Sequence, residues 1–148
     1  MKTNIIRFLA IITLAVAFAS CQKKHSAPTI ILTEVGHENS KKAEQGDDMH
    51  LEADILAEGL IKSIYVGIHQ ESGSYEIGMS YTTGKYIGVK NTEFHEHIDI
   101  PADAPLGDYH LHLTVMDNEG QTATVEAHVE VIANDGIDDD EEEHHHED

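Results

Sequence analysis

Histidine is the residue type with the most scope for chemistry in this chain, since it accounts for 12 of 148 residues. Imidazole and carboxylate side chains together bind divalent transition metals. Zinc is the first choice, with copper or nickel as alternatives, because imidazole suits all three and the single cysteine, Cys21, is not available for a thiolate site. The main predicted ligand set shares one sheet face and consists of His69, His110, His112, His128 and Glu126.

The geometry of this set follows from a predicted β-hairpin. A three-residue loop, Asn118–Gly120, joins its strands and sets His110 opposite His128 and His112 opposite Glu126. Residues directly opposed in this way have Cβ atoms about 4.5–5.5 Å apart, which lets two imidazoles share one zinc ion. The preceding strand should add His69 and complete a triad of His69, His110 and His128. The alternative is a solvated polar face on which histidine has no ligand role.

Two further groups are candidates for metal binding. His95, His97 and Asp99 alternate along another strand, where side chains on one face lie roughly 7 Å apart. The closing segment, 134–148, contains His144, His145 and His146 among many acids, so it is expected to be disordered and to bind metal weakly. A purely solubilising tail is the alternative. A calcium site at the Asp117–Glu119 loop is a weaker hypothesis, because that loop is short.

The elements that must position these residues are β-strands. Apolar and polar residues alternate with period two between turn signals, which is typical of half-buried strands. The expected strands are 29–34, 49–56, 61–70, 75–81, 85–89, 93–100, 108–117 and 121–132. This spacing predicts an all-β, immunoglobulin-like antiparallel β-sandwich at 29–133. Tyr109 resembles the tyrosine of a tyrosine corner, and its strand should bury Leu111, Leu113 and Val115 as well.

The start of the chain predicts export. Residues 1–20 have a basic beginning and a short apolar stretch, as in a signal peptide, and Cys21 follows small residues as in a lipobox. We expect lipidation of Cys21, a tether at 21–28 and a location in the bacterial cell envelope, as an outer-membrane lipoprotein on its periplasmic or its surface face. The alternative is an ordinary signal peptide followed by a free cysteine.

Composition excludes some functions. The formal net charge of −19 would repel phosphates, so we expect no nucleic-acid partner. The sequence contains no nucleophile elbow, phosphate-binding glycine loop or cofactor fingerprint, so we expect no enzymatic activity. We therefore predict an envelope lipoprotein that binds zinc, either to buffer it or to deliver it to an outer-membrane transporter. The rival hypothesis is a structural, adhesion or glycan- or protein-binding module without a metal role.

A family resemblance supports part of this interpretation. The pair Ile68-His69 and the string IPADAPLGDYHLHLTVMDNEG, residues 100–120, are similar to a lipoprotein family of the Bacteroidota described as a domain of unknown function, DUF4625. The resemblance runs from about Pro28 to Ile132, and His69 and His110 match its pattern. It implies an immunoglobulin-like sandwich with histidine-rich strands and a lipid anchor, and it implies no particular biochemical activity.

Overall fold

The structure is a computed structural model that describes residues 24–134. The expected signal peptide at 1–20, the lipidation site Cys21 and the tail histidines His144, His145 and His146 lie outside the described residues. Within 24–134, no helix is both long and apolar enough to cross a membrane.

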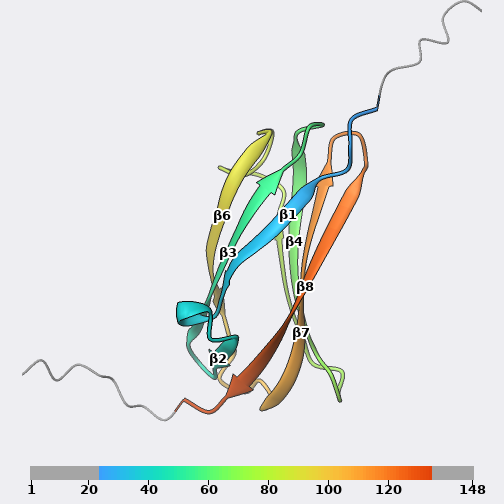
Figure 1. The fold of residues 1–148 in the computed structure, drawn as a ribbon. Coiled ribbons are helices and arrows are strands. Elements are labelled where there is room, and N and C mark those ends of the chain that lie inside the picture. Colours follow the sequence, from blue (N-terminus) through green and yellow to red (C-terminus); the bar gives the residue numbers. More distant parts are fainter. Residues whose placement is uncertain (1–23, 135–148) are drawn as a thin grey trace, which may run out of the picture.

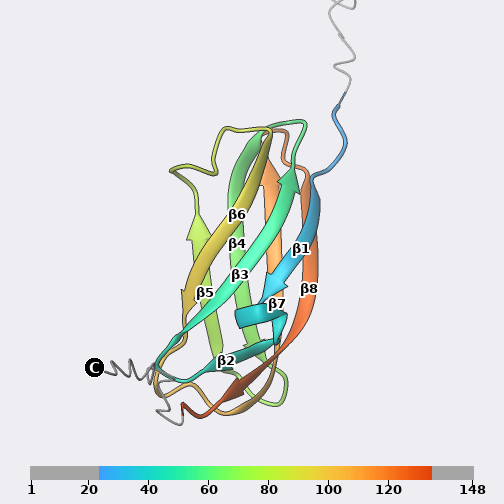
Figure 2. The same cartoon turned by 60° about the vertical axis from the view of Figure 1, so that its left-hand side comes forward.

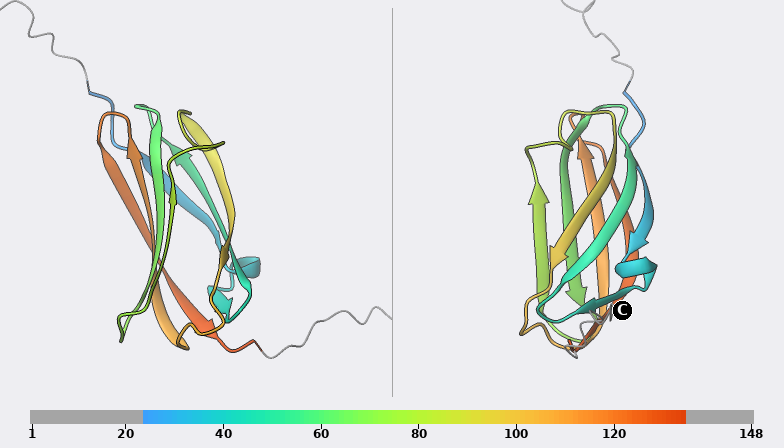
Figure 3. Two further views of the ribbon diagram at one scale, coloured as in Figure 1. Left: turned by 180° about the vertical axis from the view of Figure 1, so that it is seen from behind. Right: turned by 90° about the vertical axis from the view of Figure 1, so that its left-hand side faces the viewer.

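Two β-sheets pack face to face and confirm the predicted all-β sandwich (Figures 1 and 2). Figure 3 shows the same two layers from behind and from the side. The three-stranded sheet has the order β1-β3-β6, with bounds Thr29–Val35, Asp48–Leu56 and Asn91–Asp99. The five-stranded sheet has the order β2-β8-β7-β4-β5, with bounds Lys42–Glu44, Thr122–Ile132, Gly107–Asp117, Ile61–Gln70 and Glu76–Tyr81. A short 3-10 helix, His37–Asn39, connects β1 to β2.

The core lies between the sheets and contains the residues predicted to face inward on β7. Tyr109, Leu111, Leu113 and Val115 are all fully buried. The Tyr109 hydroxyl donates a hydrogen bond to the carbonyl oxygen of Pro105 over 2.7 Å, as expected for a tyrosine corner. The Tyr109 ring is therefore buried while its hydroxyl keeps a hydrogen-bond partner.

The pairing of the central strands also follows the predicted register. In the β7–β8 hairpin, His110 lies opposite His128 and His112 lies opposite Glu126. On the other side of β7, His69 of β4 lies opposite His110. Side chains of alternate residues on these strands therefore share the outer face of the five-stranded sheet.

The expected strand at 85–89 is wrong, and one short strand was missed. Residues 82–90 form a loop in which Gly84 and Gly88 have positive φ angles of 92° and 77°, so the backbone cannot continue as a strand. The loop turns the ring of Tyr86 into the core, where it is 3% exposed. The missed strand β2 is only three residues long and pairs in parallel with the end of β8.

The described part of the predicted tether lies on the domain. The His25 backbone N–H donates to Glu119 Oε2 over 3.0 Å, and its ring Nδ1 lies 2.6 Å from Glu119 Oε1. Gln121 Nε2 donates to the His25 carbonyl oxygen over 2.6 Å, and Pro28 is buried. Residues 24–28 are thus docked on the β7–β8 hairpin, at the end of the sandwich opposite the last described residues (Figure 1).

Candidate metal centre

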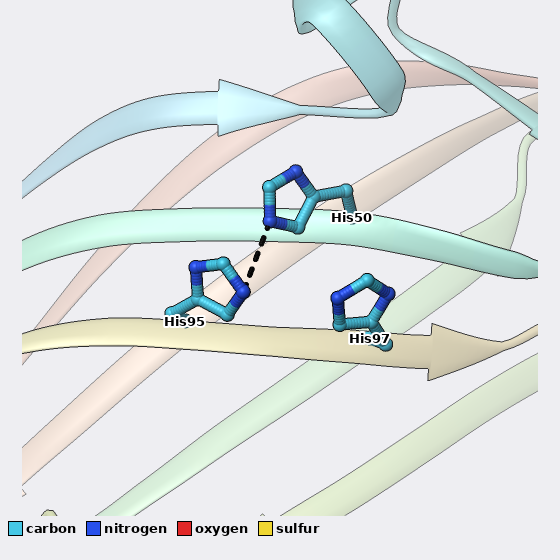
Figure 4. A group of neighbouring side chains, drawn as sticks. All are labelled: His50, His95 and His97. Carbon is cyan, nitrogen blue, oxygen red and sulfur yellow. Dashed lines mark hydrogen bonds between the residues drawn. The ribbon is translucent and has the colours of Figure 1, made fainter.

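Three histidines gather on the outer face of the three-stranded sheet. His50 comes from β3, and His95 and His97 come from β6. The antiparallel register sets His50 opposite His97 and Glu52 opposite His95. Because Met49, Leu51, Phe94 and Ile98 point into the core, the alternating histidines must point outward. Figure 4 shows the three rings side by side above the two strands.

The spacing of the ring nitrogens suits one tetrahedral ion. The Nε2 atoms of His50 and His95 are 3.3 Å apart. Two nitrogens bound to the same tetrahedral zinc at about 2.0–2.1 Å would be separated by about 3.3–3.4 Å. The His97 ring stacks on that of His50 with centroids 5.0 Å apart, and one ring nitrogen of each histidine lies within 4.8 Å of the others. In Figure 4 the Nε2 side of the His97 ring faces the other two rings.

A carboxylate lies beside the other nitrogen, Nδ1, of each ring. Glu34 is 3.1 Å from His50, Glu52 is 2.6 Å from His95, and Asp48 is 3.1 Å from His97. An ionised carboxylate only accepts hydrogen bonds, so it favours the tautomer that carries its proton on Nδ1. The Nε2 lone pair is then free for a cation. Carboxylate–histidine pairs of this kind orient imidazoles in metal sites.

The contact between His50 and His95 needs a proton or a cation between the two Nε2 atoms. When both rings carry their proton on Nδ1, their Nε2 lone pairs face each other over 3.3 Å without a donor between them. Three arrangements remove this conflict: the Nε2–H tautomer of one neutral ring, a second proton on one ring, or a metal ion bound to both nitrogens. Glu52 Oε1, at 3.4 Å from His50 Nε2, could accept that second proton's hydrogen bond in the metal-free protein.

A β-bulge places Glu34 at this site. The pairing of β1 with β3 shifts between Leu32 and Glu34, so Thr33 is an extra residue in the strand. Uninterrupted alternation would put Glu34 on the inner face with Ile30 and Leu32. After the shift, Val35 is buried and Glu34 points outward to His50. Glu34, His50 and Glu52 form a second group of three ligand atoms within 4.8 Å of one another.

Hydrogen bonding shifts the pKa values of two groups at the site. Asp48 accepts a hydrogen bond from His97 and adds an attractive charge, and together these raise the pKa of His97 above its ordinary value of 6.5. The hydrogen bond from His50 lowers the pKa of Glu34. Glu34 therefore stays ionised next to His50 at neutral pH.

The five residues of the main predicted set share the outer face of the other sheet, but their rings form pairs. His69 and His112 lie edge to face with centroids 5.2 Å apart, and His112 Nδ1 is 3.2 Å from Glu126. His110 and His128 have centroids 6.4 Å apart. Within residues 24–134, no three of the five offer ligand atoms within 4.8 Å of one another. The triad of His69, His110 and His128 therefore has no common centre in this arrangement, and metal binding by this set stays a prediction.

A shallow hollow of about 590 Å³ lies on the three-stranded sheet, at the end away from the histidines. Its wall includes Ile31 and Leu56, which are 59% and 44% exposed. Polar residues at the start of β6, Asn91 and Thr92, form another side of the hollow.

Comparison with known sequences identifies the family. Residues 19–132 match the family described as a domain of unknown function, DUF4625. The chain belongs to the DUF4625 family. Among curated proteins, none matches this DUF4625 chain.

Solved structures resemble the DUF4625 domain in fold alone. Catalytically inactive OgpA from Akkermansia muciniphila, in complex with an O-glycopeptide, is 14% identical with a TM-score of 0.50, covering 76% of this chain and 31% of OgpA. Wild-type OgpA gives the same identity and TM-score over 71% of this chain and 29% of its own. A DUF4466 family protein from Parabacteroides merdae is 13% identical with a TM-score of 0.49, over 70% and 44% of the two chains. The DUF4625 chain thus spans about a third of OgpA.

Sequence reasoning predicted part of the histidine cluster on the three-stranded sheet of this DUF4625 domain. His95 and His97 come together as one face of β6, whereas Asp99 lies opposite Asp48 at the end of the ladder and belongs to neither group of ligand atoms. His50, Glu34 and Glu52 were missed. The signal for His50 and Glu52 was their alternation with buried Met49, Leu51 and Ala53, which places both on an outer face.

Tyr86 supports the site from the core side of the DUF4625 domain. Its hydroxyl lies 2.7 Å from the carbonyl oxygen of His95 and accepts the His95 N–H over 3.2 Å. Since β6 is an edge strand, these two backbone groups have no partner strand on that side. The hydroxyl also contacts the carboxylate of Glu96, and burial raises its pKa.

We expect Tyr86→Phe to lower the free energy of unfolding by about 1–3 kcal/mol, because it leaves part-buried backbone groups of His95 without the Tyr86 hydroxyl as a partner. Chemical denaturation of the metal-free protein measures this loss. Tyr75→Phe is the matched control, because the Tyr75 hydroxyl has only a 3.4 Å exposed contact with Asp103. Equal losses in the two variants would contradict the role given to Tyr86.

Proposed function

We propose that this protein binds one divalent transition metal ion, with zinc favoured over copper and nickel, through His50, His95 and His97. The observation that carries the proposal is the 3.3 Å separation of the His50 and His95 Nε2 atoms, together with a carboxylate on the Nδ1 of each of the three rings. Three neutral imidazoles and an open fourth position form a common zinc coordination set. Glu34, Glu52 and Asp48 would orient the ligands from the second coordination shell.

The exposure of the site favours exchange of the ion. The His95 and His97 side chains are 49% and 55% exposed, so the fourth position would face solvent or a partner. Such a site fits buffering, or delivery to an outer-membrane transporter, better than permanent structural binding, in which zinc is enclosed by four protein ligands. We propose a binding role rather than a catalytic one, in an envelope lipoprotein anchored through Cys21.

The test is a zinc competition titration against a chromophoric chelator. The chain is used at full length with H144Q, H145Q and H146Q, so that the tail histidines cannot contribute. We expect one ion bound far more tightly than the second cation site inferred below. A dissociation constant for zinc of about 1 mM or weaker would contradict the proposal, because surface histidines that form no defined site bind zinc with a similar affinity.

Zinc affinity should fall as the pH is lowered. The fall should begin at a higher pH than it does in a site of histidines with the ordinary pKa. The metal needs neutral imidazole, and the pKa of His97 is raised above 6.5 by Asp48, so protons begin to compete above that pH. The stability of the metal-free protein should change with pH in the opposite direction. The stabilisation from the pair of protonated His97 and Asp48 is present below pH 6.5, and it is lost as the pH rises through the raised pKa of His97.

Competition titrations at several pH values, with NMR titration of the His97 ring, measure the effect on affinity. In Asp48→Asn the pKa of His97 should return toward 6.5, so the loss of affinity should begin at a lower pH. An affinity that is constant between about pH 8 and pH 5.5 would mean that imidazole is not the ligand.

The alternative function is a ligand- or partner-binding module without a metal role. The observation that favours it is the hollow of about 590 Å³ with the exposed side chains of Ile31 and Leu56. Under this alternative, Ile31→Ser would abolish partner binding while His95→Gln with His97→Gln would leave it intact. Metal binding predicts that only the histidine changes affect zinc.

A further inference from the structure

Two histidines and two carboxylates meet at one end of the outer face of the five-stranded sheet. His110 of β7 lies directly opposite His128 of β8. Asp108 precedes His110 on the same face of β7, and Glu71 follows the last residue of β4. The Glu71 backbone N–H donates to the Asp108 carbonyl oxygen over 2.9 Å, which holds Glu71 beside the end of β7.

Each contact between a carboxylate and a ring in this group is made to the Nε2 atom of the ring. Glu71 Oε1 lies 2.9 Å from Nε2 of His110 and 3.9 Å from Nε2 of His128. Asp108 Oδ1 lies 3.0 Å from Nε2 of His128. Glu71 thus reaches toward both imidazoles, and Asp108 adds a second carboxylate to His128.

We propose that His110, His128, Glu71 and Asp108 form a second site for a divalent transition metal ion, independent of the site at His50. Ligand atoms of tetrahedral zinc are about 3.3–3.4 Å apart. Two of the three nitrogen–oxygen distances, 2.9 and 3.0 Å, are shorter than this separation, and the third, 3.9 Å, is longer. In the metal-free protein each Nε2 atom lies within ion-pair distance of a carboxylate. The ion would bind the Nε2 lone pairs of two neutral rings that carry their protons on Nδ1, and the two carboxylates would balance its two positive charges.

The neighbouring histidines are engaged elsewhere. His112 pairs with Glu126 and stacks edge to face with His69, whose Nδ1 is 3.7 Å from Glu76. The side chains of His110 and His128 are each 51% exposed, so they can rotate toward a common ion. Among the described residues this set does not yet bring three ligand atoms within 4.8 Å of one another. The site must therefore close around its ion, and it should bind more weakly than the site at His50.

The experiment measures zinc stoichiometry and affinity by calorimetry on the full chain carrying H144Q, H145Q and H146Q. This parent should bind two ions per chain, one tightly and one weakly. His95→Gln with His97→Gln should remove the tight ion and leave the weak one. Adding His110→Gln and His128→Gln to that variant should remove the weak ion, and adding Glu71→Gln and Asp108→Asn instead should weaken it by at least about tenfold.

The matched control changes the other two histidines of the same face. His69→Gln with His112→Gln, in the His95→Gln and His97→Gln background, should leave the weak ion in place. The inference is overturned if the His95→Gln and His97→Gln variant binds no zinc. It is also overturned if the change at His69 and His112 removes the weak ion while the change at His110 and His128 does not. If the parent binds only the weak ion, the second site stands and the proposed function fails. Circular dichroism of each metal-free variant checks that it is folded.

Discussion

Replacing His50 with glutamine should weaken zinc binding by more than about 100-fold, beyond the roughly 10–100-fold that loss of a second-shell partner costs. His50 is the one residue that belongs to both groups of ligand atoms on the three-stranded sheet. Its Nε2 atom lies 3.3 Å from that of His95, and its ring stacks on that of His97. The glutamine side chain offers no imidazole nitrogen at this position. Competition titration measures the change.

The matched control for this prediction is His37→Gln. His37 is exposed in the 3-10 helix and is not a member of either group of ligand atoms, so its loss should leave zinc affinity unchanged. Glu52→Gln should have an intermediate effect of about 10–100-fold, because Glu52 orients His95 over 2.6 Å without itself being required as a ligand. A His50→Gln protein that binds zinc as the parent does would contradict the assignment of the site.

Replacing Phe94 with alanine should lower the free energy of unfolding by about 3–5 kcal/mol. Phe94 is fully buried and directly precedes His95 in the chain. The centroid of its ring lies 4.9 Å from that of Tyr86 and 5.3 Å from that of Tyr81. Truncation leaves a cavity behind β6, the strand that carries two of the three histidines. Urea denaturation of the metal-free protein measures the loss.

Zinc should partly restore the stability of this variant. An ion that binds only the folded protein at 100 times its dissociation constant adds about 2.7 kcal/mol. Phe94→Leu is the control and should lose only about 1–2 kcal/mol, because it keeps most of the buried volume. Combining Phe94→Ala with His50→Gln should remove most of the effect of zinc, at a concentration that saturates the site at His50 and leaves the weaker second site largely empty. Equal stabilisation of that double variant by zinc would show that the ion binds elsewhere.

The fold could be predicted where the signal was local. Alternation of apolar and polar residues gave the faces of β7, and the three-residue loop before Gln121 set the register that pairs His110 with His128. Tyr109 predicted the corner at Pro105 because its contact spans only four residues. Residues 85–89 were mistaken for a strand because several of them are apolar, although Gly88 adopts a positive φ angle.

The site at His50 required information that the sequence does not carry locally. β3 and β6 are neighbours in the sheet, but β4 and β5 lie between them in the chain, so no turn sets their register. The bulge at Thr33, which turns Glu34 outward, interrupts an otherwise regular alternation. Glu71 lies beyond the end of its strand, and the pairing of β4 with β7 together with its backbone contact with Asp108 brings it near His110 and His128.

Anomalous diffraction at the zinc edge, from crystals of the full chain grown with zinc, tests the central claim most directly. The account predicts an ion bonded to the Nε2 atoms of His50, His95 and His97 at about 2.0–2.1 Å, with Glu34, Glu52 and Asp48 still on the three Nδ1 atoms. Crystals in which these three rings bind no ion while zinc is bound elsewhere would contradict it.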